Sequence, residues 1–327
     1  MVRFIDYLFS RIPHLEIMAR IIYWRYEWFH SFSQRVKSQK NRHAKPSSTY
    51  DQGGNTASLL DVENELRKHG VTTGDILVVH SSMQSLACTG ASTGEVIDML
   101  LRVIGESGTL VMPAIPKYKE AAVVASGVAR ITADLTDEVW TYDVQKTVPW
   151  TGALPYKLMK TPGARRGRHP LNTIVAKGFH VNEMFALELN SSHSTPCGPE
   201  SAWAFCAKHN AKIVALGCDL AHSLTMIHVA EDCHEQDWPV AGWYRERTFL
   251  VKDEEVKTKV IVRERHPKWA MHYCERKLDF DLRRNNISKA SKIGNITVTS
   301  VDSAPLLKFL EDKRSKAYPY YLCWMQK

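Results

Sequence analysis

From residue 59 onward, the sequence predicts an α/β domain in which short buried strands alternate with amphipathic helices. Two observations support this prediction. Compact aliphatic runs bounded by Gly, Pro or polar residues indicate strands, and apolar residues spaced three or four positions apart indicate helices. Strands are expected at 76–80, 109–112, 212–217 and 262–266, and helices at 59–69, 95–104 and 225–233.

The domain begins with a helix and a strand. Leu59, Val62 and Leu66 share one face of a helix over 59–69. A turn then leads to the strand 76–80, Ile-Leu-Val-Val-His, which is apolar enough to be buried.

The following elements repeat this alternation. The helix 95–104 leads to the strand 109–112, which ends at Pro113 because proline cannot donate to a strand ladder. The residues of 262–266 alternate between apolar and charged, as expected for a strand with one exposed face.

Residues 1–43 differ in composition from the rest of the chain. They contain eight Lys and Arg against three Asp and Glu, together with nine aromatic residues. Apolar residues recur at roughly helical spacing and are interrupted near Pro13, so we expect a basic, aromatic helical arm. Residues 44–58 are rich in Ser, Thr, Gly and Pro and are predicted to be a linker, which leaves 59–327 as the main domain.

Composition and charge exclude several classes of protein. No apolar run reaches 18 residues, no secretory signal is recognisable, and the seven scattered cysteines form no CxxC pair. We therefore expect a cytoplasmic protein without a disulfide framework or a metal site. The arm contributes +5 of the net charge of +8, which disfavours a nucleic-acid-binding cleft in the main domain. The motifs GxGxxG, GxxxxGK[ST], HExxH and GxSxG are absent, which removes support for the corresponding enzyme classes.

Ser81 and Ser82 directly follow the strand 76–80. Hydroxyl groups and free backbone N–H groups at a strand end suit a polar ligand such as a phosphate or an amide chain. A helix cap or a turn is the alternative, and it is the commoner use of such serines.

The segment Gly163–Pro170 contains three arginines within four positions. Guanidinium groups bind phosphate in bidentate fashion, although a solvated basic loop is the more common structure for such a run. His169 precedes a proline, which holds its backbone extended and orients the ring for either a functional or a structural hydrogen bond.

Candidate catalytic groups lie further along the chain. Thr225, His228 and Glu231 are spaced three residues apart, so Thr225 and His228 share a helix face and Glu231 lies one turn further on. A histidine beside a carboxylate can act as a general base, whereas a lone helical histidine is more often structural. Glu264, on the predicted strand 262–266, could orient a histidine from elsewhere or form a surface ion pair.

Six segments of the chain contain motifs in a particular order. They are Gly74–Ser82 (GDILVVHSS), Gly105–Pro113 (GESGTLVMP), Tyr142–Pro155, Arg166–Gly178, Cys197–Ser201 (CGPES) and Lys212–Glu231, which ends in TMIHVAE. In this order and spacing they resemble the aminoglycoside 3-N-acetyltransferase (antibiotic N-acetyltransferase) family. Each segment alone is weakly specific, but the six together are specific, and the similarity covers about 59–275.

The resemblance implies a three-layer α/β/α sandwich that uses acetyl-CoA as co-substrate and transfers the acetyl group directly to an amine, without a metal. The family's TxLH histidine corresponds to His228, the general base, and its supporting carboxylate corresponds to Glu264. The implied acetyl-CoA contacts are His80, Ser81, Ser82, Ser85, Arg166, Thr173 and Thr225. The implied acceptor contacts are Asp143, His169 and Glu231.

The acceptor is predicted to be an amino sugar. Antibiotic-modifying relatives tend to have acidic residues after the second strand, where this chain has Lys117 and Lys119. We therefore expect a neutral or anionic sugar conjugate, with aminoglycoside acetylation as the alternative on the same fold. A non-catalytic, membrane-associated scaffold is the alternative of another class, because His266 stands where the family often has Asp.

The arm 1–43 lies outside the segments that resemble the family. Its basic and aromatic residues suit peripheral contact with an anionic membrane surface. Packing on the main domain or on a second copy in a homodimer is the equally weighted alternative.

Overall fold

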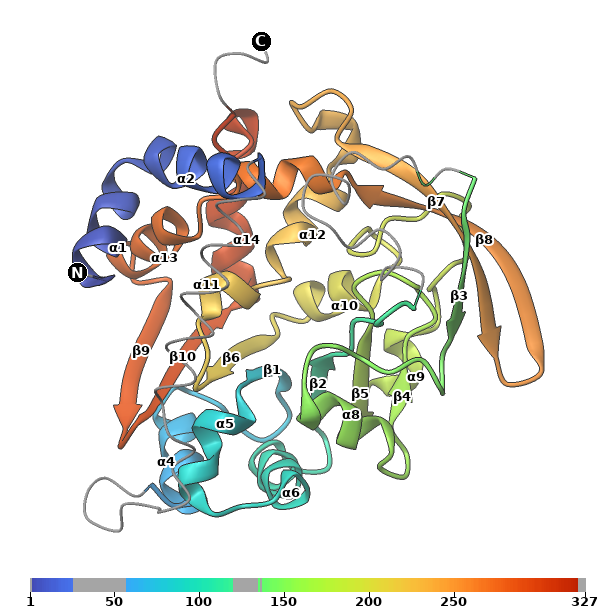
Figure 1. Ribbon diagram of the computed structural model, residues 1–327. Helices are drawn as coiled ribbons and strands as arrows, with labels where there is room; N and C mark the ends of the chain where they lie inside the picture. The colour runs from blue at the N-terminus through green and yellow to red at the C-terminus, as the bar shows by residue number, and fades with distance from the viewer. Residues whose placement is uncertain (1, 26–56, 120–134, 136, 323–327) are drawn as a thin grey trace.

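The computed structural model describes residues 2–25, 57–119, 135 and 137–322. Within these residues, a mixed seven-stranded sheet and a three-stranded sheet form the framework, and helices surround them (Figure 1). The strands are β1 (Ile76–Ser81), β2 (Thr109–Pro113), β3 (Val139–Asp143), β4 (Arg165–Arg166), β5 (Ile174–Gly178), β6 (Lys212–Leu216), β7 (Tyr244–Asp253), β8 (Val256–Arg265), β9 (Ser288–Ile293) and β10 (Ile296–Asp302). The α-helices are α1 (Val2–Arg11), α2 (Pro13–Arg25), α4 (Leu59–Lys68), α5 (Met83–Leu86), α6 (Thr93–Ile104), α8 (Ala153–Met159), α9 (Val181–Met184), α10 (Ala202–Lys208), α11 (Leu220–Ser223), α12 (Ile227–Asp232), α13 (Glu275–Arg284) and α14 (Ser303–Glu311).

Helices cover both faces of the large sheet. Its strand order is β4-β5-β2-β1-β6-β10-β9, and β1 is parallel to both β2 and β6. Successive side chains of β1 enter two different cores, because Leu77 and Val79 pack with α4 and α6 whereas Val78 packs with α10, α12 and α14. The predicted three-layer α/β/α sandwich is therefore confirmed.

The predicted strands and helices of the main domain are present, with some ends shifted. α6 begins at Thr93 because Ser92 caps it: the Ser92 hydroxyl accepts a hydrogen bond from the Glu95 N–H, and the Glu95 carboxylate accepts one from the Ser92 N–H. α12 begins at Ile227, slightly later than expected. The predicted strand 262–266 is the final part of the longer β8.

The three-stranded sheet, in the order β3-β7-β8, lies to one side of the large sheet (Figure 1) and has its own core. Trp140 and Phe249 are buried in that core, and the Arg247 guanidinium lies 4.1 Å from the centroid of the Trp140 ring. The antiparallel pairing of β7 with β8 sets Glu264 directly opposite Arg245.

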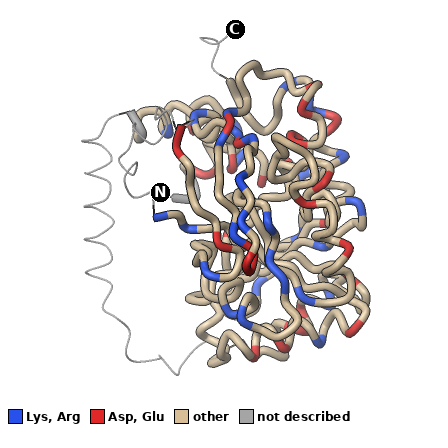
Figure 2. The backbone as a smooth tube through the Cα atoms, turned by 90° about the vertical axis from the view of Figure 1, so that its right-hand side faces the viewer, with Lys and Arg blue, Asp and Glu red and all other residues tan. Residues whose placement is uncertain are grey.

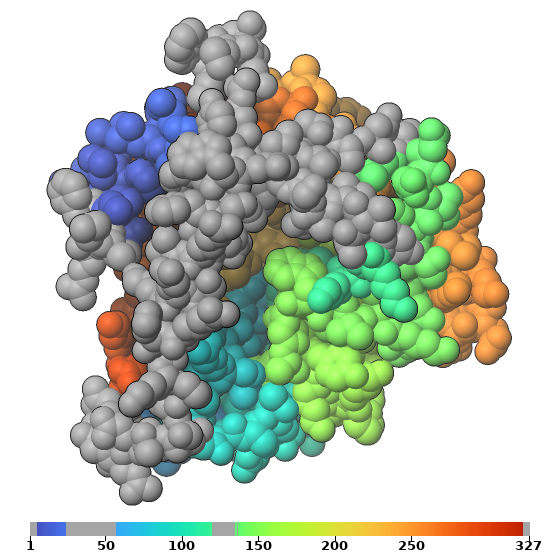
Figure 3. Space-filling model, viewed as in Figure 1, coloured from blue at the N-terminus to red at the C-terminus, as the bar shows by residue number. Residues whose placement is uncertain are grey.

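The described part of the N-terminal arm consists of α1 and α2, which pack on α13 and on the 3-10 helix η4 (Pro267–His272) of the same chain. Figure 1 shows α1 beside α13, and the arm is the blue segment at the surface in Figure 3. Ile17 of α2 is fully buried, and Arg276 of α13 pairs with Asp6 of α1 at 3.0 Å. The predicted helical arm is thus confirmed for these residues, and their contacts favour packing on the main domain. Residues 26–56, which hold the rest of the arm and most of the predicted linker, lie outside the described residues.

Acidic and basic residues are interspersed along the described chain (Figure 2). None of the described helices is both long and apolar enough to cross a membrane. Five of the cysteines are free thiols: Cys88, Cys197, Cys206, Cys218 and Cys233.

Candidate active site

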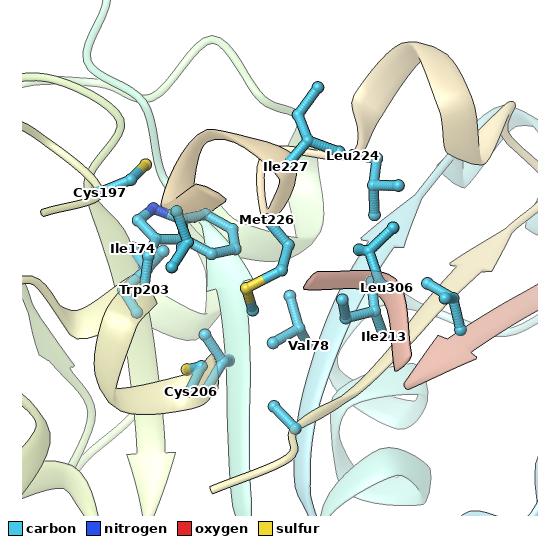
Figure 4. Packing of buried hydrophobic residues seen from close by; sticks show 14 of the residues in the cluster. Val78, Ile174, Cys197, Trp203, Cys206, Ile213, Leu224, Met226, Ile227 and Leu306 are labelled. Atoms are coloured by element: carbon cyan, nitrogen blue, oxygen red, sulfur yellow. The ribbon is translucent and has the colours of Figure 1, made fainter. Parts of the chain in front are cut away.

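α12 brings His228 to the wall of a cavity. Met226 and Ile227, at the start of this helix, are buried in the same core as Trp203 and Val78 (Figure 4). These two apolar side chains fix the first turn of the helix, and His228 lines the cavity next to it.

The cavity has a volume of about 610 Å³ and lies at the carboxyl ends of β1, β2 and β6, where open α/β sheets commonly bind ligands. His80 and Ser81 enter its wall from the end of β1, and Thr225 and His228 enter from α12 and the turn before it. His80 is buried, and its Nε2 has no hydrogen-bond partner among the described residues. Burial lowers the pKa of His80 to about 4, so the ring is neutral and can offer this nitrogen to a ligand.

Four side chains form a hydrogen-bonded network around His228. Nδ1 of His228 lies 3.0 Å from Oε1 of Glu231, and the same oxygen accepts a hydrogen bond from the Tyr320 hydroxyl at 2.7 Å. Arg265 donates to Tyr320, and its Nη1 lies 3.2 Å from Nδ1 of His228. The Glu231 side chain is 2% exposed and that of His228 is 17% exposed, so the carboxylate supports the ring from the protein interior.

The charges of this network decide the protonation states of its members. Burial and the positive charge of Arg265 lower the pKa of His228, and Glu231 opposes them only in part. The imidazole is therefore neutral at neutral pH, which is the form that accepts a proton. Burial alone would raise the pKa of Glu231, but His228 and Arg265 outweigh it and hold that pKa below its usual value. A proton on Nδ1, directed at the ionised Glu231, leaves Nε2 as the free base.

Two of the predicted acetyl-CoA contacts, Ser82 and Ser85, make structural hydrogen bonds instead of lining this cavity. Ser82 is the N-cap of α5 and accepts a hydrogen bond from the Ser85 N–H. The Ser85 hydroxyl donates to the carbonyl oxygen of Gly217 at 2.8 Å. Both serines stabilise the turn that follows Ser81. The capping role that the sequence analysis gave as the alternative for this motif therefore applies to Ser82.

Arg166 does not fit the predicted phosphate contact. Its guanidinium is buried and donates to the carbonyl oxygens of Ala114, Val144 and Thr147, and it lies 5.2 Å from the centroid of the Tyr142 ring. These hydrogen bonds connect β4 with two other chain segments through the two Nη groups, whereas Nε has no hydrogen-bond partner among the described residues.

Three further predicted contacts also lie away from the cavity. Thr173 is buried and donates to the carbonyl oxygen of Gly167 at 3.1 Å. Asp143 accepts backbone N–H hydrogen bonds in the turn after β3. His169 is buried beside a separate cavity, and its Nδ1 accepts a hydrogen bond from the Leu171 N–H at 3.1 Å. These contacts give each residue a local structural role and do not support its assignment to acetyl-CoA or to the acceptor.

Glu264 does not contact His228 in this structure. Its carboxylate accepts hydrogen bonds from Arg245 at 2.7 Å and from Arg247 at 3.2 Å. It lines a smaller cavity of about 220 Å³ that His228 and Glu231 also line. The carboxylate that contacts His228 is Glu231, which was expected from the sequence to contact the acceptor, and the observed contacts of Glu264 do not support its predicted role beside His228.

Sequence reasoning missed Arg265 and Tyr320. Arg265 follows Glu264 on the predicted strand 262–266, and nothing in its position in the sequence indicates a contact with His228. Tyr320 is 89 residues from Glu231, so only the folded chain brings the two together. No group of His, Cys, Asp and Glu side chains suited to a metal ion occurs within the described residues.

The comparisons with known proteins agree with this architecture. The family model described as aminoglycoside 3-N-acetyltransferase matches residues 78–313, which is most of the chain. The chain belongs to this family. The match includes α12 with His228 and Glu231, as well as β8 with Arg265.

Similar members of the aminoglycoside 3-N-acetyltransferase family come from several bacteria. Aminoglycoside N(3)-acetyltransferase IX of Micromonospora chalcea is 27% identical over 188 residues, which are 56% of this chain and 65% of that protein. Aminoglycoside N(3)-acetyltransferase III of Serratia marcescens is 29% identical over 178 residues, which are 53% of this chain and 64% of that protein. The matched segment thus spans somewhat less than two thirds of either relative.

Solved structures share the fold of this family member. AAC-IIIb in a binary complex with CoASH has a TM-score of 0.64 at 19% identity and covers 82% of this chain and 99% of its own. The aminoglycoside acetyltransferase AAC(3)-Xa has a TM-score of 0.62 at 19% identity and covers 80% of this chain and 93% of its own. At this identity, the likeness shows a common fold.

Proposed function

We propose that this protein transfers the acetyl group of acetyl-CoA to an amino group of an aminoglycoside, with His228 as the general base. The observation that supports this function best is the His228–Glu231 pair on the wall of the cavity. The names of the relatives, and the CoASH complex of AAC-IIIb, support the choice of reaction and of acetyl donor.

His228 moves the proton in the proposed reaction. Acetyl-CoA supplies an activated acetyl thioester, and the acceptor supplies an unprotonated amine. As the C–N bond forms and the C–S bond breaks, Nε2 of His228 takes a proton from the amine and then returns it to the departing thiolate. A positioned general base of this kind contributes about 10²- to 10⁴-fold to the rate.

Glu231 and Arg265 act on His228 in opposite directions. Arg265 helps to keep the imidazole neutral before the reaction, and the buried Glu231 stabilises the imidazolium that forms during it. Tyr320 donates to the Glu231 carboxylate and fixes its orientation.

The residues at the end of β1 fit the acetyl donor. His80 offers a buried nitrogen that has no hydrogen-bond partner in the described part of the chain, and Ser81 and Thr225 offer hydroxyl groups to the same cavity. We assign these three residues to the pantetheine amides and the thioester carbonyl, whose oxygen needs hydrogen-bond donors as negative charge develops on it.

The acceptor we propose differs from the sugar conjugate expected from the sequence. That expectation rested on Lys117 and Lys119, and neither side chain lines the cavity with His228. The relatives are aminoglycoside N(3)-acetyltransferases, which favours the alternative that the sequence left open.

An acceptor screen tests the proposal. The purified chain is mixed with acetyl-CoA and either kanamycin or a nucleotide-linked amino sugar, and free thiol and product mass are measured. We expect thiol release and acetylated product with kanamycin. Release with the nucleotide sugar alone would overturn the acceptor class, and acetyl-CoA binding without acceptor-dependent release would support a non-catalytic scaffold.

A further inference from the structure

The N-terminal helix α2 contributes to the wall of the cavity that holds His228. The family match begins at residue 78, so α2 precedes it in the chain. Arg20 of α2 nevertheless lines the cavity, next to His222 of α11 and Glu275, the first residue of α13.

These side chains form a connected ion-pair cluster. Nη2 of Arg20 lies 2.7 Å from Oε1 of Glu275 and 3.0 Å from Oε1 of Glu16. Nδ1 of His222 lies 2.9 Å from Oε2 of Glu275, so each oxygen of this carboxylate has one partner, and hydrogen bonding to Glu275 raises the pKa of His222. The Glu275 side chain is 9% exposed, whereas that of His222 is 72% exposed.

We propose that α2 is part of the acceptor site, in which Arg20 positions Glu275 and the Glu275 carboxylate binds a second amino group of the acceptor. This inference rests on the proposed function, because it assigns a role to a wall of the same cavity. In this arrangement Glu275 holds one ammonium group of the acceptor, and a second amino group, after losing its proton, faces His228.

The two partners of Glu275 differ in how readily a ligand can displace them. Arg20 is held by two carboxylates and is 26% exposed, whereas His222 projects largely into solvent. An ammonium group that enters the cavity can therefore replace the imidazole on Oε2 while Arg20 keeps Oε1 in place. Burial opposes ionisation of Glu275, but His222 and Arg20 outweigh it and lower the pKa of this carboxyl, so it is charged at neutral pH.

Arg20 also separates two carboxylates of like charge. Glu16 and Glu275 repel each other, and the guanidinium between them offsets that repulsion. Without Arg20, one of the two would take up a proton more readily or move away from the other. Arg20 is thus a positioning residue, and its effect on the acceptor passes through Glu275.

Calorimetric titration of kanamycin into the full chain tests the role of Glu275. We expect Glu275→Gln to weaken kanamycin binding by at least about tenfold, because one partner of a shielded charge pair is lost. Acetyl-CoA binding should stay within about twofold of wild type. Kanamycin binding that is unchanged in a folded Glu275→Gln protein, or absent in wild type, would overturn the inference.

A second set of variants tests Arg20. We expect Arg20→Gln to weaken kanamycin binding and raise KM with little change in kcat, and Arg20→Lys to restore much of the affinity. Arg102→Gln is the matched control, since Arg102 pairs with Glu63 at 2.7 Å on the outer helices α4 and α6. Equal losses of affinity in the Arg20 and Arg102 variants would show a general stability effect and would refute the positioning role.

Two outcomes separate this inference from the proposed function. If kanamycin binding depends on Glu275 but no thiol is released from acetyl-CoA, the inference stands and the proposed function fails. If an amine with a single amino group, such as glucosamine, is acetylated while kanamycin does not bind, the acetyl transfer stands and the inference fails.

Discussion

Replacing Glu231 with Gln is expected to slow acetyl transfer while leaving the cavity intact. The Glu231 carboxylate accepts hydrogen bonds from His228 and Tyr320 and lies 3.9 Å from Arg265. Gln retains the size and one acceptor oxygen but removes the negative charge that stabilises the imidazolium of His228. Losing a charge-assisted hydrogen bond costs about 1.5–3 kcal/mol, which corresponds to a decrease of about 10- to 100-fold in kcat.

The same substitution has a definite effect on the pH profile. Glu231 raises the pKa of His228 against the lowering by burial and Arg265, so its neutralisation should move that pKa further below 6.5. NMR titration of the His228 ring measures this shift directly, and the acid limb of kcat should move in the same direction. Tyr320→Phe is the matched control, because it removes a hydrogen bond to the same carboxylate and keeps the charge. An unchanged kcat, or a His228 pKa that rises in Glu231→Gln, would refute the reasoning.

Three further changes have distinct expected outcomes. Arg166→Ala should lower the free energy of unfolding by at least ~3 kcal/mol, because three carbonyl oxygens lose a charged donor. Calorimetry should find the affinity for acetyl-CoA unaltered, and a large loss of that affinity would show that Arg166 does contact the phosphate of acetyl-CoA. Gly217→Ala should lower the melting temperature, because φ at this residue is +69° and a Cβ there would collide with Ser85. An unchanged melting temperature would show that this position does not require glycine. Deleting residues 2–25 should reduce the free energy of unfolding by at least ~2 kcal/mol, because the site of Ile17 is uncovered. An unaltered melting temperature together with lost binding to anionic vesicles would instead favour a membrane arm.

Sequence patterns were sufficient to predict the strands and helices of the central layers, because each pattern reflects which side chains of one element must be buried. The buried strand 76–80 must be apolar on both faces, and Leu77 and Val78 do enter opposite cores. The start of α6 was predicted at residue 95 instead of Thr93, because the capping box formed by Ser92 and Glu95 was not recognised in the sequence.

The network around His228 could be predicted only in part. His228 and Glu231 are one helical turn apart, so their contact follows from spacing. Tyr320 meets them through a distant segment, which no local pattern encodes. The ion pair of Glu264 could not be predicted, because strand pairing decides its partner: Arg245 lies opposite it on β7, a strand that was not predicted from the sequence.

Basic residues were also hard to interpret from the sequence. Arg166 lies in an arginine-rich run that suits phosphate, yet it is buried among carbonyl oxygens. Arg20 belongs to an arm that composition alone connects with membranes, yet it pairs with Glu275 beside the cavity. In both cases the charge was visible in the sequence, and the partner that determines its use was not.

The turnover of a folded His228→Ala protein tests the central claim most directly. Circular dichroism and calorimetry first establish that the variant is folded and that it binds acetyl-CoA with near wild-type affinity. With acetyl-CoA and kanamycin both saturating, we expect kcat to fall by at least ~100-fold, which is the lower range for the loss of a positioned general base. A kcat within a few-fold of wild type in that folded, acetyl-CoA-binding variant would contradict the role of His228.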